Sequence, residues 1–163
     1  MRQKIIKISE KVKVDKKDIE ILRILENDGR IPILKLAKMV KLSHETVRYR
    51  LRKLVRSGVI RKFTVRINKK KLGYHIYAII MLSTWNYTEE KWNELFKYLM
   101  DHKNVATVEK ITGDFDLKFS FWAKDTEELD FISHTVKTKF SKIIKNWNSF
   151  IFTKRYKWNE LPI

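Results

Sequence analysis

The sequence predicts an α+β protein with two domains: a small helical domain, followed by a domain in which strands and helices alternate. Three observations lead to this prediction. Apolar residues recur at helical spacing in three successive segments between residues 15 and 58. After residue 73 the pattern changes to short strand-like runs separated by two amphipathic helices. Residues 1–72 also carry 23 of the 36 Lys and Arg residues but only 7 of the 19 Asp and Glu residues, whereas residues 73–163 are almost neutral.

The composition excludes several classes of protein. The chain has no cysteine, which rules out disulfide bonds and thiolate metal sites and suits a cytoplasmic protein. No apolar run approaches the length of a membrane span, and residues 1–14 do not resemble a signal peptide. The net charge of +17, concentrated in the first domain, predicts a polyanion as the partner of that domain. A membrane surface is the alternative partner, but the apolar face of the most basic helix consists of Val and Leu, where an amphipathic anchor usually carries Trp or Phe.

The first domain is predicted over residues 14–67, after a basic extension at residues 1–13. The branched apolar residues of this extension favour an ordered segment. The first helix is expected at residues 15–28, where Asp15 and Asp18 near the N-terminus suit the helix dipole. Three apolar residues, Ile19, Leu22 and Leu25, form its predicted inward stripe, which Ile21 and Ile24 widen.

A second and a third helix follow within a short distance. Pro32 starts the second, which runs to about Val40, because proline costs nothing at the first position of a helix. The third helix spans Ser43 to Gly58, which have the properties of an N-cap and of a residue just past a helix end. Three helices with tight turns, the last of them basic, are typical of a helix-turn-helix that places its third helix in a DNA major groove. A solvated surface helix is the simpler alternative.

The third helix is predicted to have two different faces. Its apolar stripe, Val47, Leu51, Leu54 and Val55, is expected to point inward. The remaining polar side chains are the predicted contacts to double-stranded DNA: Ser43, His44, Glu45, Thr46, Arg48, Tyr49, Arg52, Lys53 and Arg56. Within this set we expect base contacts near the N-terminus, from Ser43, His44, Glu45 and Tyr49, and phosphate contacts from Arg48, Arg52, Lys53 and Arg56.

Residues 59–67 alternate between apolar and polar positions and are predicted to form a strand that leaves the helical domain, in the manner of a wing. Residues 68–73 are predicted to be a linker. The second domain, residues 74–163, reads as strand, helix, strand, strand, helix, strand, which is the ferredoxin-like βαββαβ order. The expected elements are strands at 74–84, 105–112 and 117–123, a turn at 113–114, helices at 88–100 and 126–140, and a last strand within 144–157.

The strand at residues 74–84 is apolar on both faces. Two helices can cover one face of a four-stranded sheet, so the other face needs a different cover. A second copy of the chain is the simplest, and it predicts a homodimer through this domain. A monomer with an exposed apolar sheet is the alternative.

Several segments, taken together in this order and spacing, resemble the leucine-responsive regulatory protein/AsnC family of transcription regulators, also called feast/famine regulators. The resemblance spans roughly residues 14–157 and is carried by residues 14–22, 27–31, Leu36, Ala37, Leu42, Ser43, Val47, Arg50, Leu54, 58–60 and 108–117. It implies a sequence-specific DNA-binding regulator with a helix-turn-helix headpiece and a ferredoxin-like ligand-sensing domain. It further implies dimers that assemble to higher even-numbered oligomers, often octamers. In some members an amino acid binds between dimers near a turn that corresponds here to Gly113, Asp114 and Asp116.

Other chemistry has little support in the sequence. The four histidines, His44, His75, His102 and His134, contain no pair at the spacing of a zinc-binding helix, and no catalytic triad or phosphate-binding loop stands out. We therefore expect no catalytic residue, no metal and no cofactor. Two alternatives remain from other classes of function. Some siroheme decarboxylases, which act on a tetrapyrrole, resemble this family in fold and length, and a low-specificity architectural protein that coats DNA would share the basic headpiece.

Overall fold

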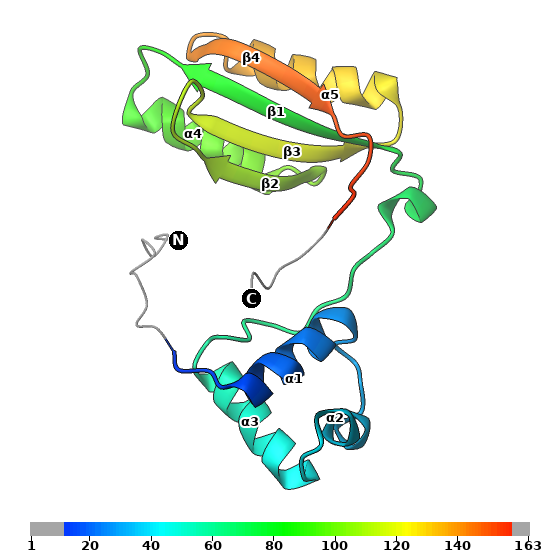
Figure 1. The fold of residues 1–163 in the computed structure, drawn as a ribbon. Coiled ribbons are helices and arrows are strands. Elements are labelled where there is room, and N and C mark those ends of the chain that lie inside the picture. The colour runs from blue at the N-terminus through cyan, green and yellow to red at the C-terminus, as the bar shows by residue number, and fades with distance from the viewer. Residues whose placement is uncertain (1–11, 158–163) are drawn as a thin grey trace. The chain divides into compact units, whose positions relative to one another are not determined.

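The computed structural model describes residues 12–157, which divide into one compact unit up to Arg66 and another from Ile67 to Tyr156. The first unit contains three helices, α1 (Lys16–Asn27), α2 (Ile33–Val40) and α3 (His44–Arg56) (Figure 1). The predicted basic extension lies almost entirely outside the described residues.

The helices of the first unit begin where their sequences provide caps. Asp15 and Asp18 form a capping box: the Asp15 carboxylate accepts from the backbone N–H of Asp18 at 2.9 Å, and the Asp18 carboxylate accepts from that of Asp15 at 3.1 Å. Pro32 is the N-cap of α2, and the C-cap Lys41, just after Val40, reverses the chain with a left-handed φ of 54°. Leu42 then leads directly into the N-cap of α3. The turn between α2 and α3 is therefore short enough to hold the two helices together as a pair.

A small apolar core holds the three helices together. Its fully or nearly buried members are Ile21, Ile31, Leu36, Ala37, Val40, Val47 and Leu54. Leu51 is half-buried beside them, but Val55, predicted to point inward, is 46% exposed. The helical period explains the difference: Leu51 and Leu54 lie within about 40° of Val47 around the helix, whereas Val55 lies about 80° away. The prediction was correct for three of the four residues and wrong for Val55.

Residues 59–67 do not form the predicted strand. They are exposed apart from Ile60, and no other part of the described chain pairs with them. Alternating residues favour an extended backbone, but a strand also needs a neighbour to accept and donate its hydrogen bonds. The following residues are more ordered than expected of a linker, because Lys69–Leu72 form a 3₁₀ helix, η1, between its N-cap Asn68 and the left-handed Gly73 (φ 85°).

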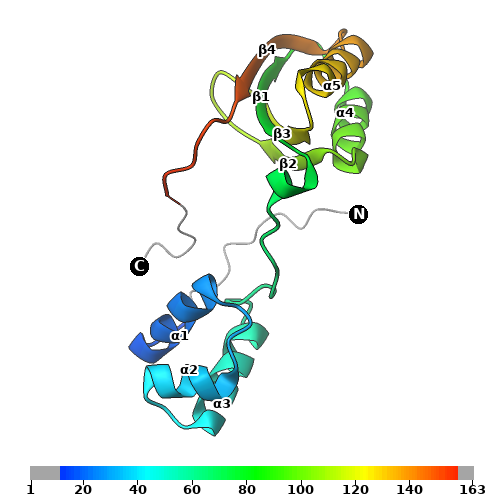
Figure 2. The same cartoon turned by 90° about the vertical axis from the view of Figure 1, so that its right-hand side faces the viewer.

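The second unit has the predicted βαββαβ order. Its elements are β1 (Ile76–Thr84), α4 (Glu89–Asp101), β2 (Val105–Lys110), β3 (Leu117–Ala123), α5 (Thr126–Lys139) and β4 (Ile144–Ile151). The strands form one antiparallel sheet in the order β2-β3-β1-β4. Thr88 caps the start of α4, and Asp125 caps that of α5. Figure 2 shows both helices on the same face of the sheet, which confirms the ferredoxin-like prediction.

The core of this unit lies between the sheet and the two helices. Alternate residues of the central strands, Ala78, Ile80 and Leu82 of β1 and Leu117, Phe119 and Phe121 of β3, are fully buried there. They pack against Leu95 and Leu99 of α4 and Ile132 and Val136 of α5. These apolar side chains give the unit a core of its own.

The opposite face of the sheet has no covering layer of helices in the described chain (Figure 2). The alternate residues of β1, Tyr77, Ile79 and Met81, lie on this open face and are half-buried. Phe150 of β4 lies directly beside Ile79 and is 47% exposed. Polar side chains interrupt the apolar surface: the Tyr77 hydroxyl donates to Ser120 Oγ at 2.7 Å, and Met81 has Lys118 and Asn148 as its neighbours on β3 and β4. The open face therefore combines aliphatic and aromatic side chains with polar and charged ones.

Candidate nucleic-acid interface and ligand turn

The N-terminus of α3 is organised by hydrogen bonds between side chains that the sequence singled out. Ser43 Oγ accepts from the backbone N–H of Thr46 at 3.2 Å and lies 2.8 Å from the Thr46 hydroxyl. This is the N-cap that the sequence predicted, and it uses the hydroxyl that was also expected to contact a base. Ser43 and Thr46 thus fix the start of the helix.

Three further residues on the first two turns of α3 form a chain of contacts. Arg48 Nη2 lies 3.3 Å from His44 Nε2, and His44 Nδ1 lies 3.2 Å from Glu45 Oε1. A guanidinium can only donate, so His44 Nε2 is the acceptor toward Arg48, and Nδ1 is the ring nitrogen that faces the Glu45 carboxylate. The hydrogen bond from His44 is the main cause that lowers the pKa of the Glu45 carboxyl below its usual value. The side chains of Arg48, His44 and Glu45 are therefore held side by side at the start of α3.

The rest of the predicted interface consists of exposed side chains along α3. Tyr49 is 64% exposed, and Arg48, Arg52, Lys53 and Arg56 are exposed as well. These cations have the reach and the accessibility that phosphate contacts require.

Arg50 departs from this pattern. Its Nη1 donates to Asp15 Oδ2 at 2.6 Å and to Asp18 Oδ1 at 2.7 Å, so the side chain turns toward α1. Arg50 was not among the predicted DNA contacts. Two carboxylates three residues apart at the start of α1 were the available signal, but nothing local connects them to an arginine 32 residues further along the chain.

The turn between β2 and β3 contains the predicted ligand residues Gly113, Asp114 and Asp116. Gly113 has a φ of 128°, which favours glycine. Asp116 Oδ2 accepts from the backbone N–H of Thr84 at 2.7 Å and from the Thr84 hydroxyl at 2.9 Å. Asp114 is exposed, so the two carboxylates have different surroundings. Asp116 ties this turn to the end of β1, a role that the sequence did not reveal.

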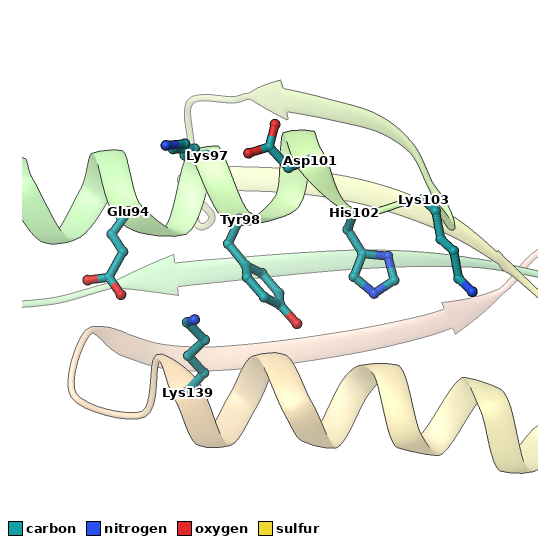
Figure 3. Close-up of a pocket in the computed structure, with 7 residues that line it drawn as sticks. All are labelled: Glu94, Lys97, Tyr98, Asp101, His102, Lys103 and Lys139. Atoms are coloured by element: carbon teal, nitrogen blue, oxygen red, sulfur yellow. The ribbon is translucent and has the colours of Figure 1, made fainter.

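A groove of about 530 Å³ lies elsewhere in the second unit, between α4 and α5. Figure 3 shows Tyr98 of α4 and His102, the C-cap of that helix, pointing toward α5, and Lys139 of α5 pointing toward α4. Lys139 Nζ lies 4.8 Å from the centre of the Tyr98 ring, which is a cation–π distance. Burial is the main cause that lowers the pKa of His102, and the charge of Lys103 adds to it. No sequence pattern had indicated this groove, although Glu94 and Tyr98 of α4 and the C-cap His102 recur every four residues.

The described residues contain no cluster of three or more His, Asp or Glu side chains that could hold a metal ion. Within residues 12–157, no helix is long and apolar enough to cross a membrane.

Comparisons with known proteins agree with this geometry. A family model described as winged helix-turn-helix DNA-binding matches residues 14–61. The HTH-type transcriptional regulator FL11 of Pyrococcus horikoshii is 35% identical over 74% of this chain and 78% of its own length. The HTH-type transcriptional regulator LrpA of Pyrococcus abyssi is 36% identical over 76% of this chain and 86% of its own.

Solved structures show the same fold at lower identity. An AsnC family transcriptional regulator from Agrobacterium tumefaciens superposes with a TM-score of 0.81 at 24% identity, covering 91% of this chain and 97% of that one. The regulator NMB0573 of Neisseria meningitidis, solved in complex with L-Met, gives a TM-score of 0.81 at 22% identity, covering 92% and 97%.

The fold, the exposed basic α3 and these relatives define a helix-turn-helix transcriptional regulator. The chain belongs to the leucine-responsive regulatory protein/AsnC family. The resemblance read from the sequence is thereby confirmed, and so is the predicted role as a DNA-binding regulator. The named relatives are transcriptional regulators, which are not enzymes, so the tetrapyrrole decarboxylase alternative is not favoured.

Proposed function

We propose that the chain regulates transcription in the cytoplasm by inserting α3 into the major groove of double-stranded DNA and reading base sequence there. The observation that supports this most is that His44 and Glu45 contact each other at the N-terminus of α3 and that Arg48 contacts His44 from the next turn, so the predicted base-contacting side chains are already ordered. Groups held in place before binding lose little freedom on contact with base edges. Base contacts come from the helix start and Tyr49. Phosphate contacts come from Arg48, Arg52, Lys53 and Arg56.

Two substitutions on α3 separate these kinds of contact. Arg52→Ala is expected to weaken binding to all DNA sequences about equally and to reduce the slope of log affinity against log salt by about one, because it removes a phosphate contact. His44→Ala is expected to change which sequence is preferred, with a loss of about 1–3 kcal/mol on the preferred site, because it removes a base contact and releases Arg48 and Glu45. Titrations of both variants on a set of duplexes that differ at single base pairs measure the two effects.

The assignment is reversed if Arg52→Ala alters the sequence preference and His44→Ala does not. Lys53→Ala is a matched control on the same helix, since it removes an exposed cation and is expected to behave like Arg52→Ala.

The functional unit that we propose is a homodimer, formed through the open face of the sheet, that assembles into higher even-numbered oligomers. The apolar and aromatic side chains of this face, including Ile79, Met81 and Phe150, support the proposal. In a two-fold symmetric dimer the same face of each copy packs against the other, so one kind of surface is enough to form the interface.

We also propose that an amino acid binds near Gly113, Asp114 and Asp116 and modulates DNA binding. Two structural relatives support this by their descriptions: the Neisseria regulator and a feast or famine regulatory protein of Mycobacterium tuberculosis were both solved with methionine. A carboxylate at an assembly interface can accept charge-assisted hydrogen bonds from an α-ammonium group. A ligand held between dimers shifts the oligomer distribution, and the oligomer determines how many headpieces reach one DNA.

Asp116→Asn tests the ligand proposal. We expect the variant to lose about 1–3 kcal/mol of stability, because the hydrogen bonds from Thr84 lose their charged acceptor. We also expect some amino acid to raise the melting temperature of the wild type but not that of the variant, since a ligand that binds only the folded state stabilises it. A thermal-shift screen of the twenty amino acids measures both effects.

Thr84→Val is the matched control, because it removes one hydrogen bond to Asp116 and leaves the carboxylate in place. This control is expected to be less stable yet still to respond to the ligand. If no amino acid raises the melting temperature of the wild type, Asp116 serves only to fix the turn.

A further inference from the structure

Arg50 differs from the exposed arginines of α3 in the direction of its side chain. The guanidinium faces the protein, where it is 22% exposed and bonded to Asp18, whose side chain is only 1% exposed. Arg50 Nε is also buried and has no hydrogen-bond partner among the described residues. An arginine in this position is not available to a phosphate without leaving its place.

Arg50 completes a closed set of hydrogen bonds with two carboxylates. Asp15 Oδ1 and Asp18 Oδ2 accept from backbone N–H groups in the capping box of α1. The other two oxygens, Asp15 Oδ2 and Asp18 Oδ1, accept from Arg50 Nη1. All four carboxylate oxygens thus have a partner. The hydrogen bond with Arg50 is the main cause that lowers the pKa of the Asp15 carboxyl, and the same contacts raise the pKa of Arg50.

These contacts connect the recognition helix to a fixed point of the domain. Asp15 and Asp18 lie at the first turn of α1, and Arg50 lies in the middle of α3, between the exposed Tyr49 and the half-buried Leu51. Apolar packing of Val47 and Leu54 sets the distance between helices but is not directional. Charge-assisted hydrogen bonds are directional, so they can fix how far α3 is rotated about its own axis. Rotation of α3 decides which side chains meet base edges.

We propose that Arg50 is a positioning residue for DNA recognition: together with Asp15 and Asp18 it sets the orientation of α3 and makes no contact with DNA. This inference rests on the proposed role of α3 as the base-reading helix. It separates Arg50 from the other arginines of that helix in a measurable way. Removal of a phosphate contact reduces the number of counterions released, whereas a change of helix orientation reduces the discrimination between sequences.

The test compares Arg50→Met and Arg50→Lys with Arg52→Gln in the full-length chain. Each variant is titrated over a salt series on a genomic fragment selected by the wild type and on a scrambled duplex, at a temperature where circular dichroism shows it folded.

Arg50→Met is expected to lower the ratio of the affinities for these two DNAs at least tenfold and to leave the salt slope unchanged. Arg50→Lys is expected to recover part of the ratio, because an ammonium can still bridge the carboxylates. Arg52→Gln is expected to keep the ratio and to lower the slope by about 0.9 for each phosphate that the variant no longer neutralises.

A triple variant keeps the test decisive if Arg50→Met does not fold. Asp15→Ser with Asp18→Gln preserves the capping box, and Arg50→Met then removes the last charge of the cluster, so no buried charge is left unpaired. The triple variant is expected to be folded and to show the same loss of discrimination.

Two results would overturn the inference: a lower salt slope in the Arg50 variants, which would make Arg50 a phosphate contact, or an unchanged ratio in the folded triple variant, which would make the cluster purely structural. If the wild type itself shows no sequence preference, the proposed function fails first, and the wild-type titration reveals this independently of the variants.

Discussion

DNA binding by the full-length chain is expected to weaken by roughly 10³–10⁵-fold between 50 and 200 mM salt, if a dimer contacts about 6–10 phosphates. The reason is the concentration of charge: residues 1–72 hold 23 Lys and Arg against 7 Asp and Glu. Four exposed cations of α3, Arg48, Arg52, Lys53 and Arg56, supply candidate contacts from each copy. Fluorescence anisotropy of a labelled duplex over a salt series measures the slope.

A complex whose affinity barely changes with salt would contradict the electrostatic basis of binding. The double variant Arg52→Gln/Lys53→Gln serves as an internal reference, since it removes two cations per chain without touching the core. Its slope should be smaller than that of the wild type by about 0.9 for each phosphate left without its cation.

Self-association is expected to be the second large effect, and Ile79→Glu is expected to abolish it. Ile79 lies on the open face of the central strand β1, beside Phe150. In a two-fold dimer the substitution buries two unpaired carboxylates, each at a cost of several kcal/mol. Since about 1.4 kcal/mol is a factor of ten, the dimer should weaken at least about a thousandfold. Sedimentation velocity of the full-length chain measures the change.

Phe131→Glu provides the control for this experiment. Phe131 is 71% exposed on α5, on the opposite side of the sheet from Ile79, so the same kind of change there should leave the dimer intact. Residues 74–163 contain the whole sheet and are expected to dimerise alone. A wild-type protein that sediments as a monomer would overturn the interpretation of the doubly apolar strand.

Elements whose signals are local could be predicted from the sequence. Ser43 as the cap of α3, the strand–helix alternation of the second unit and the inward stripe of Val47, Leu51 and Leu54 all depend on neighbours within one or two turns. The missing strand at residues 59–67 shows the limit of such signals. Residues 63–67 alternate as in a true strand, but pairing depends on a partner that no local pattern reveals.

The candidate sites also divide into features with a local sequence signal and features without one. The exposed face of α3 follows from helical periodicity, which places the predicted contacts outward. The roles of Arg50 and Asp116 do not, because each acts on a residue 32 positions away in the chain. In both cases the sequence reveals the charged residue, but only the folded chain shows which residue it contacts. The carboxylate assigned to a ligand and the arginine left unassigned both proved to hold two elements together.

Selection of bound fragments from genomic DNA by the full-length chain, at a salt concentration near 200 mM that suppresses non-specific binding, tests the central claim of sequence-specific regulation most directly. We predict enrichment of a small set of fragments that share a pseudo-palindromic motif, with half-sites about one helical turn (10–10.5 base pairs) apart or a multiple of that distance, as two symmetric copies of α3 require. Bound fragments spread evenly over the genome without a common motif would contradict this claim and would identify a protein that coats DNA with little specificity.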